Sequence, residues 1–336
     1  MFDFKSSPLF VQAKKAKFSP SMPILIIIVF VIFYISQFVS AVPLGVLSGI
    51  FSAFEFEKMG AIGENGELLI SSEEMLEIMT RILSTDIMRL AALFLTVTTI
   101  VITVLWCRFI EKRSLSSMGF VKKNFLLQYI FGMLVGLVMF AVVFLICVAT
   151  KAIDFNGFNA SANFTMIALF FLAFIIQGAS EEILMRGFFM ISATRTSSVF
   201  TAILVSSVAF SLLHSGNSGV SVLAFINILL FGVFCSLYMI RTSNIWGVCA
   251  IHSVWNFAQG NIFGCLVSGM NLSNSLFLSE IDANRVTTNG GEFGPEGGVA
   301  VTLVLVIAIM LVVFIPTKNK SMSQVGQKED SDNCEG

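Results

Sequence analysis

The sequence has little charge: only 12% of its residues are Asp, Glu, Lys or Arg, against about 25% in a typical soluble domain. The formal net charge is −1, so the sequence offers no basic surface for a nucleic-acid partner. Its six cysteines are scattered, mostly within apolar runs, without metal-ligand spacing or the pattern of a disulfide framework. These shortages exclude a soluble domain, a nucleic-acid-binding protein and a disulfide-stabilised secreted fold.

Apolar residues, by contrast, make up 56% of the sequence and recur in long runs. A run of about twenty apolar residues is long enough for an α-helix to cross a bilayer. We therefore predict an all-α, polytopic membrane protein with about eight transmembrane helices, whose first partner is the lipid bilayer. The predicted spans cover residues 23–45, 87–107, 125–149, 164–193, 197–214, 219–240, 245–266 and 298–316.

Lysine and arginine predict the orientation, because they collect in the cytoplasmic connections of a membrane protein. Basic residues precede the first predicted span at 14–17 and fill the connection at 108–123, whereas the alternate connections at 55–67 and 280–292 carry mainly acidic residues. We therefore expect both the N-terminus and the C-terminus in the cytoplasm. Cleavage of the first apolar run as a signal peptide near Ala41 is less favoured, because the run continues past that residue.

The predicted spans divide the chain into four segments. A cytoplasmic N-terminal segment (1–22) precedes the first transmembrane helix and an acidic outer loop (23–86); a membrane core (87–316) precedes a polar tail (317–336) that we expect to be disordered. In the outer loop, Ser71 and Glu74 have the spacing of a capping box, which predicts a short helix there. We expect this helix to pack as a structural lid rather than to perform chemistry.

The predicted span at 164–193 contains three charged residues, Glu181, Glu182 and Arg186. A charge inside a span costs roughly 2.5–3.5 kcal/mol on an insertion scale, so each one needs a reason. Glu182 and Arg186 are four residues apart, which is the spacing of an ion pair along one helix face. Glu181 points about 100° away from its neighbour and is left unpaired, which makes it a candidate functional residue.

The chain's only two histidines also lie in predicted spans. His214 ends "FSLLH" and His252 begins "HSVWN", with Asn256 one turn later on the same helix face. Counting about 1.5 Å per residue from the cytoplasmic connections places Glu181, His214, His252 and Asn256 within about two turns of one another in depth. We therefore expect these four side chains to meet in a polar cavity inside the bilayer.

Three short motifs carry a resemblance to a known family. "EEILMR", "FSLLH" and "HSVWN" resemble the EExxxR, FxxxH and HxxxN motifs of the CPBP family, the CAAX-processing and bacteriocin-processing intramembrane proteases also called Abi. Together, in this order and on successive predicted spans, the motifs are specific. The resemblance covers roughly residues 90–316, so it identifies the predicted core at 87–316 as similar to a CPBP intramembrane protease core.

The resemblance implies that a glutamate-dependent site hydrolyses a peptide bond within the membrane. Glu181 would be the general base that activates water, and His214 would hold or polarise that water. His252 and Asn256 would stabilise the oxyanion of the tetrahedral intermediate, and Arg186 would orient its glutamate partner. Glu181, His214 and His252 are equally a three-ligand set for catalytic zinc, so zinc remains open as a cofactor.

A peptide or a membrane protein is the expected substrate, and eukaryotic relatives of this family act on prenylated proteins. The Phe-, Ile- and Met-rich composition and the lack of an ER retrieval signal favour a bacterial plasma membrane, where prenylated proteins are not expected. Two alternatives stay open. A polytopic transporter would use intramembrane Glu and His residues to relay protons or ions, and a non-catalytic bacteriocin-immunity protein would bind peptide without cleaving it.

Overall fold

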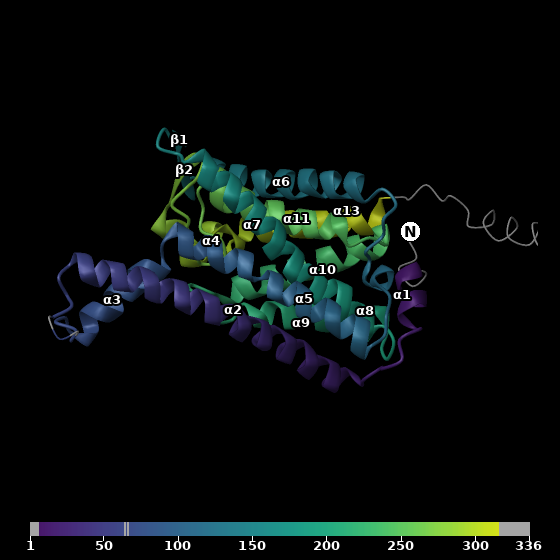
Figure 1. Cartoon of the computed structure of the whole chain (residues 1–336). Coiled ribbons are helices and arrows are strands. Elements are labelled where there is room, and N and C mark those ends of the chain that lie inside the picture. The colour runs from purple at the N-terminus through teal and green to yellow at the C-terminus, as the bar shows by residue number, and fades with distance from the viewer. Residues whose placement is uncertain (1–6, 64, 66, 316–336) are drawn as a thin grey trace, which may run out of the picture.

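The computed structural model describes residues 7–315 except residues 64 and 66, so the tail expected at 317–336 lies outside the described part. Helices occupy each of the eight ranges that the apolar runs predict (Figure 1). The longer ones are α2 (Met22–Lys58), α6 (Phe125–Ala149), α7 (Phe164–Glu182), α9 (Val199–Leu213), α10 (Val222–Thr242), α11 (Trp246–Phe257) and α13 (Val299–Phe314). The shorter ones are α1 (Pro8–Ala13), α3 (Ser72–Leu83), α4 (Asp86–Leu95), α5 (Val97–Leu105), α8 (Ile191–Ala193) and α12 (Val286–Asn289).

Several of these helices continue as π-helical segments. Trp106–Ile110 extends α5, Ile183–Met190 joins α7 to α8, and Ala258–Ile262 extends α11. With these extensions, five helices in the described residues are long and apolar enough to cross a membrane, and α9 and α13 are shorter apolar helices. This confirms an all-α, polytopic membrane protein. The number of eight crossings and the cytoplasmic location of both termini remain predictions.

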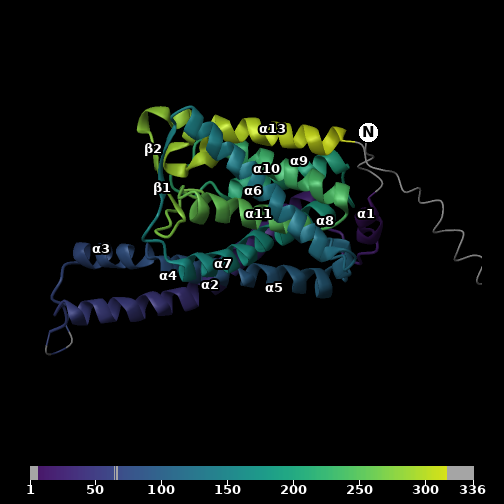
Figure 2. The same ribbon diagram turned by 90° about the horizontal axis from the view of Figure 1, so that it is seen from above.

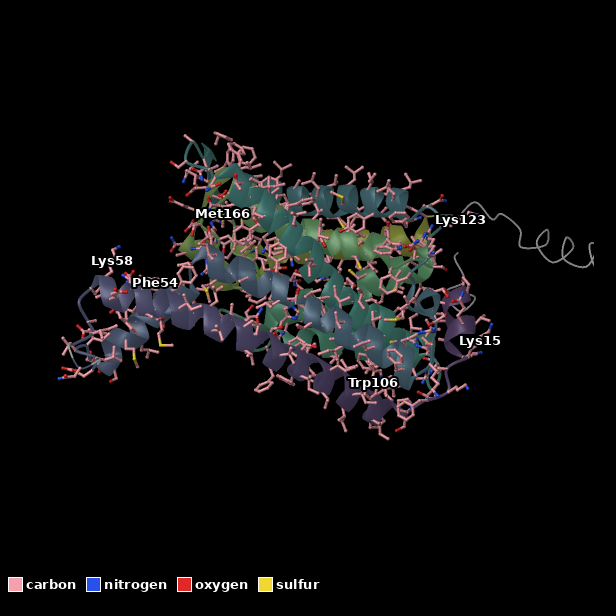
Figure 3. All side chains as sticks on the ribbon, in the orientation of Figure 1. Lys15, Phe54, Lys58, Trp106, Lys123 and Met166 are labelled. Carbon is pink, nitrogen blue, oxygen red and sulfur yellow. The ribbon has the colours of Figure 1, made fainter. Side chains whose placement is uncertain are left out.

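Labelled lysines and the projecting part of α2 distinguish the two ends of the helix bundle. Lys15 and Lys123 lie at the end that also holds α1, whereas Lys58 lies at the opposite end, beyond the bundle (Figure 3). Helix α2 continues to Lys58, well past the end predicted at residue 45, and α3 packs back against its projecting part (Figures 1 and 2). The capping box at the start of α3 is confirmed, since the side chains of Ser71 and Glu74 each bond the other's backbone N–H.

Helix α11 lies between α6 and α7, and small residues permit this close packing. A side chain at Gly136 of α6 would place its Cβ 2.4 Å from the backbone oxygen of Ile251 in α11. A side chain at Gly178 of α7 would place its Cβ 2.6 Å from the backbone nitrogen of Ser253. Glycine is therefore required at both positions, as is common where membrane helices approach closely. This packing fixes the height of α11, and with it that of His252, against α7.

The structure contains a small antiparallel sheet that was not predicted. Strands β1 (Ile153–Phe158) and β2 (Phe277–Ile281) pair with Ile153 opposite Ile281, at the end of the bundle away from α1 (Figures 1 and 2). β2 belongs to the long connection between α11 and α13, and the pairing anchors this connection against the end of α6. The connection then passes over the polar cavity described below.

Candidate active site

Glu182 and Arg186 form the ion pair that the sequence predicts. Both side chains are fully buried, and Arg186 Nη1 lies 2.9 Å from Glu182 Oε1. Glu182 is the last residue of α7, and the π-helical segment Ile183–Met190 begins directly after it. The guanidinium of Arg186 also stacks on the ring of Phe210, with Cζ 4.4 Å from the ring centroid, which further stabilises a buried cation. The pair therefore holds helix α9, which carries Phe210, against the end of α7.

The same Glu182 oxygen binds His252, a contact that links distant parts of the sequence. Nδ1 of His252 lies 2.8 Å from Glu182 Oε1. Because a carboxylate only accepts hydrogen bonds, Nδ1 carries a proton, and the ring is oriented with Nε2 towards the cavity. Phe231 packs edge-on against the ring at 5.1 Å between centroids. Glu182 thus fixes both the orientation and the tautomer of His252.

Glu181 differs from its neighbour in exposure and in partners. Its side chain is 25% exposed, and its Oε1 accepts a hydrogen bond of 2.7 Å from Gln177 Nε2, one turn earlier in α7. Its Oε2 lies 3.5 Å from His252 Nε2 and 3.8 Å from His214 Nε2. These distances are too long for good hydrogen bonds, and Oε2 has no hydrogen-bond partner. The structure therefore brings Glu181 and both histidines together around one free carboxylate oxygen.

His214, like His252, is held by a hydrogen bond at Nδ1, but its partner is a backbone oxygen. It follows α9 directly, and its Nδ1 donates to the backbone oxygen of Phe210 at 2.9 Å. In the neutral ring, the proton on Nδ1 leaves a lone pair on Nε2. When both rings are neutral, their Nε2 atoms and Oε2 of Glu181 are three acceptors that face one another. A water molecule beside them would satisfy two of these three acceptors at a time, because it has two protons to donate.

Asn256 reaches Glu181 through an intermediate residue that the sequence reasoning missed. Asn256 Nδ2 donates to Gln177 Oε1 at 2.9 Å, and the amide of Gln177 donates in turn to Glu181. Gln177 lies four residues before Glu181, which is one helical turn. This spacing could have identified Gln177 as a partner of the unpaired carboxylate. The second hydrogen of the Asn256 amide is not needed for the contact with Gln177 and is free for another acceptor.

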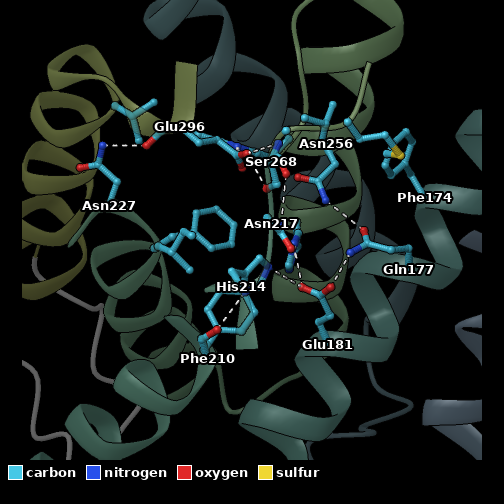
Figure 4. A pocket seen from close by; sticks show the side chains of 18 of the residues that line it. Phe174, Gln177, Glu181, Phe210, His214, Asn217, Asn227, Asn256, Ser268 and Glu296 are labelled. Atoms are coloured by element: carbon cyan, nitrogen blue, oxygen red, sulfur yellow. Dashed lines mark hydrogen bonds and ion pairs between the residues drawn. The ribbon is translucent and has the colours of Figure 1, made fainter. Parts of the chain in front are cut away.

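These side chains line a cavity of about 430 Å³ (Figure 4). Glu181, His214, His252 and Asn256 all lie on its wall, as the sequence predicts. Part of the opposite wall comes from the connection that follows α11, and it includes Ser268 and Glu296, which the sequence reasoning did not single out. A smaller cavity of about 170 Å³ lies among α2, α5, α7 and α9, and Glu181 and His214 line it as well. The carboxylate of Glu181 is thus placed between two open spaces.

The zinc alternative has the right kinds of donor atom in Glu181, His214 and His252. Among the described residues, however, no group of three or more His, Cys, Asp or Glu side chains is arranged so that it could hold a metal ion. If zinc were bound, Glu181, His214 and His252 would be the residues to hold it, and it would polarise the attacking water.

Comparison with known protein families gives one match. Residues 163–258 match the family model described as Rce1-like, type II CAAX prenyl endopeptidase. This range contains all three motifs and every site residue that the sequence predicts, and it ends before the connection that carries Glu296. No curated protein and no solved structure matches the chain significantly.

Proposed function

We propose that this chain, which belongs to the CPBP family of CAAX-type intramembrane proteases, hydrolyses a peptide bond with a water molecule that Glu181 activates. One observation carries the proposal: Oε2 of Glu181 is buried without a hydrogen-bond partner and faces two histidine nitrogens, in a residue that lines the cavity. An intramembrane carboxylate without a partner is costly, and the cost is explained if the oxygen serves the reaction.

In the first step, the oxygen of the water attacks the peptide carbonyl carbon while Glu181 takes a proton from that water. His214 holds this water through Nε2, because its Nδ1 is occupied by the backbone oxygen of Phe210. Gln177 keeps the carboxylate in place through Oε1 and leaves Oε2 for the proton. The proton on Glu181 is then available for the nitrogen of the leaving amine when the peptide bond breaks.

The negative charge that develops on the carbonyl oxygen needs donors on the other side of the cavity. The free amide hydrogen of Asn256 is one, since Gln177 uses only the other. His252 is the second donor when its Nε2 has taken up a proton from solvent before the peptide binds, and Glu182 stabilises that form through the contact at Nδ1. Arg186 balances the charge of Glu182 in the resting site and keeps it aimed at the ring.

The decisive test is Glu181→Gln in detergent-purified protein, with quenched fluorogenic peptides, prenylated and plain, as substrates. The amide keeps the shape of the side chain but cannot accept the proton, so we expect turnover to fall by at least the roughly 10²–10⁴-fold that a general base contributes. Peptide binding should stay close to normal. Glu111→Gln is the control, because Glu111 is another carboxylate within the protein, is fully buried and lines neither cavity.

Three other results would replace the proposal. Equal turnover in Glu181→Gln and in the parent protein would show that another group is the base. Loss of turnover on treatment with a chelator, with recovery on adding zinc, would show a metal-dependent reaction. Peptide binding without cleavage would indicate an immunity protein, and proton-coupled uptake into vesicles that survives loss of both histidines would indicate a transporter.

A further inference from the structure

A second carboxylate, that of Glu296, lines the cavity that holds Glu181. Glu296 lies in the connection between α11 and α13, outside the range that matches the family. It takes no part in the proposed hydrolysis. In the close view of the cavity, Glu296 and Ser268 lie on the side away from Glu181 (Figure 4). A charged group in this place needs its own explanation, because a carboxylate is costly to keep in a partly enclosed site.

The backbone around Glu296 is fixed firmly. Gly294 has a φ of 91°, and a side chain there would place its Cβ 2.2 Å from the backbone oxygen of Leu266, so only glycine fits. From α10, Asn227 Nδ2 donates to the backbone oxygens of Glu296 and Gly298 at 2.7 and 2.9 Å. These contacts hold the Pro295–Gly297 turn against the helix bundle. The carboxylate of Glu296 therefore has a defined place over the cavity.

The hydrogen bonds of this carboxylate come from neutral groups and leave room for a ligand. Oε1 accepts from Trp255 Nε1 at 3.2 Å, and Oε2 accepts from the backbone N–H and the hydroxyl of Ser268 at 2.8 and 2.7 Å. All three donors are neutral groups, so none of them cancels the charge of a carboxylate. A carboxylate has about four acceptor positions, so one remains open after these three bonds.

The rest of the described cavity lining offers Glu296 no lysine or arginine, and its two histidines, His214 and His252, face Glu181. The lining in the described part of the chain includes the two carboxylates of Glu181 and Glu296 but no Lys or Arg. Arg186 is buried behind the wall, where it pairs with Glu182. The cavity is therefore negative on two sides. Such a cavity attracts a cation and repels an anion, including the free carboxylate at the end of a peptide.

We infer that Glu296 is a specificity residue that selects a peptide with a cationic group within a few residues of the cleaved bond. The group would be the side chain of a Lys or Arg, or a free terminal ammonium, and it would occupy the open acceptor position of Glu296. A cavity of about 430 Å³ is large enough for such a side chain beside the reacting bond. The inference rests on the proposed hydrolysis and adds a substrate class to it: cationic peptides rather than peptides recognised by a terminal carboxylate.

The first experiment compares quenched peptides that differ at one position. All are acetylated and amidated, and the position next to the cleaved bond is scanned with Lys or with Gln. We expect kcat/KM to be about tenfold higher for the Lys peptide, mainly through a lower KM, and the preference to shrink as salt is raised. A peptide without Lys but with a free N-terminus shows whether an ammonium at the chain end serves equally well. Freeing the C-terminal carboxylate should lower cleavage.

The second experiment locates the preference. In Glu296→Gln the ratio of Lys to Gln cleavage should fall from about ten to about one. In Glu292→Gln, which changes an exposed acid of the same connection that does not line the cavity, the ratio should stay at its original value. Equal cleavage of the Lys and Gln peptides by the parent protein would overturn the inference. An unchanged ratio in Glu296→Gln would also overturn it.

Binding separates this inference from the proposed hydrolysis. The same peptides are bound to Glu181→Gln protein, with fluorescence anisotropy as the readout. A tighter complex with the Lys peptide that depends on Glu296 supports the inference even if no peptide is cleaved by the parent protein. Cleavage by the parent protein without any preference for Lys in cleavage or binding would leave the proposed hydrolysis standing and refute the role of Glu296.

Discussion

The charges around Glu182 and the charges around Glu111 are both buried, but they differ in what lies beside them. The Glu182 cluster, formed by Glu182, Arg186 and His252, borders the cavity through His252. In the Glu111 cluster, the hydroxyl of Ser192 lies 3.1 Å from Oε1 and 3.0 Å from Oε2 of Glu111, and Glu111 also pairs with two arginines. Its members are Glu111, Arg113, Ser192 and Arg195, and none of them lines either cavity.

The contacts of the Glu111 cluster are those of a structural clamp. Arg113 Nε lies 2.8 Å from Glu111 Oε2, and Arg195 Nη1 lies 3.4 Å from Oε1. Arg113 also donates to the backbone oxygen of Gly187 at 3.1 Å, inside the π-helical segment. The backbone oxygen of Glu111 accepts from the N–H of Lys17, which ties the N-terminal segment to the same place. Four parts of the chain are thereby joined.

Burial of charged residues alone therefore does not identify a functional site. In the Glu111 cluster, both carboxylate oxygens have partners. Glu181 lies next to the Glu182 cluster and lines the cavity, and its buried Oε2 has no hydrogen-bond partner. The partners of a paired carboxylate offset the cost of burying it. A carboxylate oxygen without a partner can still bind a ligand or take part in a reaction.

The largest effect is expected from removing one arginine of each cluster. Arg186→Ala and Arg113→Ala each leave a buried carboxylate without its main partner, and each should lower the free energy of unfolding by about 3–5 kcal/mol. Per folded molecule, turnover should fall in Arg186→Ala, because Glu182 no longer orients His252, and should hold in Arg113→Ala. Chemical unfolding in detergent and active-site-normalised kinetics measure the two quantities.

Double variants are the control for this prediction. Adding Glu182→Gln to Arg186→Ala, or Glu111→Gln to Arg113→Ala, removes the stranded charge and should restore part of the stability. Turnover should not return in the first case, because Gln at 182 gives His252 a weaker partner. Equal folded yields for single and double variants would show that the charges are not buried as pairs.

A smaller effect is expected from Asn256→Ala. Loss of one oxyanion donor should lower kcat about a hundredfold, or about 2.7 kcal/mol, with little change in KM. Ser192→Ala is the counterpart in the Glu111 cluster, where it removes a hydroxyl donor of similar strength. This variant should cost about 1 kcal/mol of stability and leave kcat unchanged. A drop in kcat for Ser192→Ala would mean that the clamp also acts on the reaction.

The local parts of this molecule were predictable from the sequence. Helices followed from apolar runs, because a bilayer forces the backbone to bond within each segment. The Glu182–Arg186 pair followed from a spacing of four residues on one helix. The meeting of Glu181 with both histidines followed from depth along three helices, and the family match supports the same three motifs. The boundaries of the core at 87–316 remain a prediction.

The parts that were missed depend on contacts between distant segments. The pairing of β1 with β2 joins residues far apart in the chain, and neither short strand has a strong pattern of its own. Glu111 looked like one charge in a basic connection, and its burial comes from partners at 113, 192 and 195. Glu296 belongs to a glycine-rich connection whose path over the cavity depends on contacts with Leu266 and Asn227.

The smallest effect is expected at Glu74. Its carboxylate is exposed to solvent, whereas the carboxylates of both clusters are buried. The backbone N–H of Ser71, and then its hydroxyl, bond this carboxylate and lower its pKa below the ordinary value for glutamate. The folded helix α3 therefore prefers the ionised form. Its extra stability is complete above the pKa of the unfolded chain and is lost as the pH falls through the lower pKa of the folded helix.

Hydrogen exchange of the amides in α3 measures this effect, after correction for the intrinsic pH dependence of exchange. Protection should fall by a few fold at most between neutral and acidic pH, because exposed hydrogen bonds contribute little. In Glu74→Gln the fall should vanish, while amides of α7 and α11 should behave alike in both proteins. A large, global loss of protection in Glu74→Gln would show that an exposed carboxylate on α3 supports the bundle as the buried clusters do, and the contrast drawn between buried and solvated charge would fail.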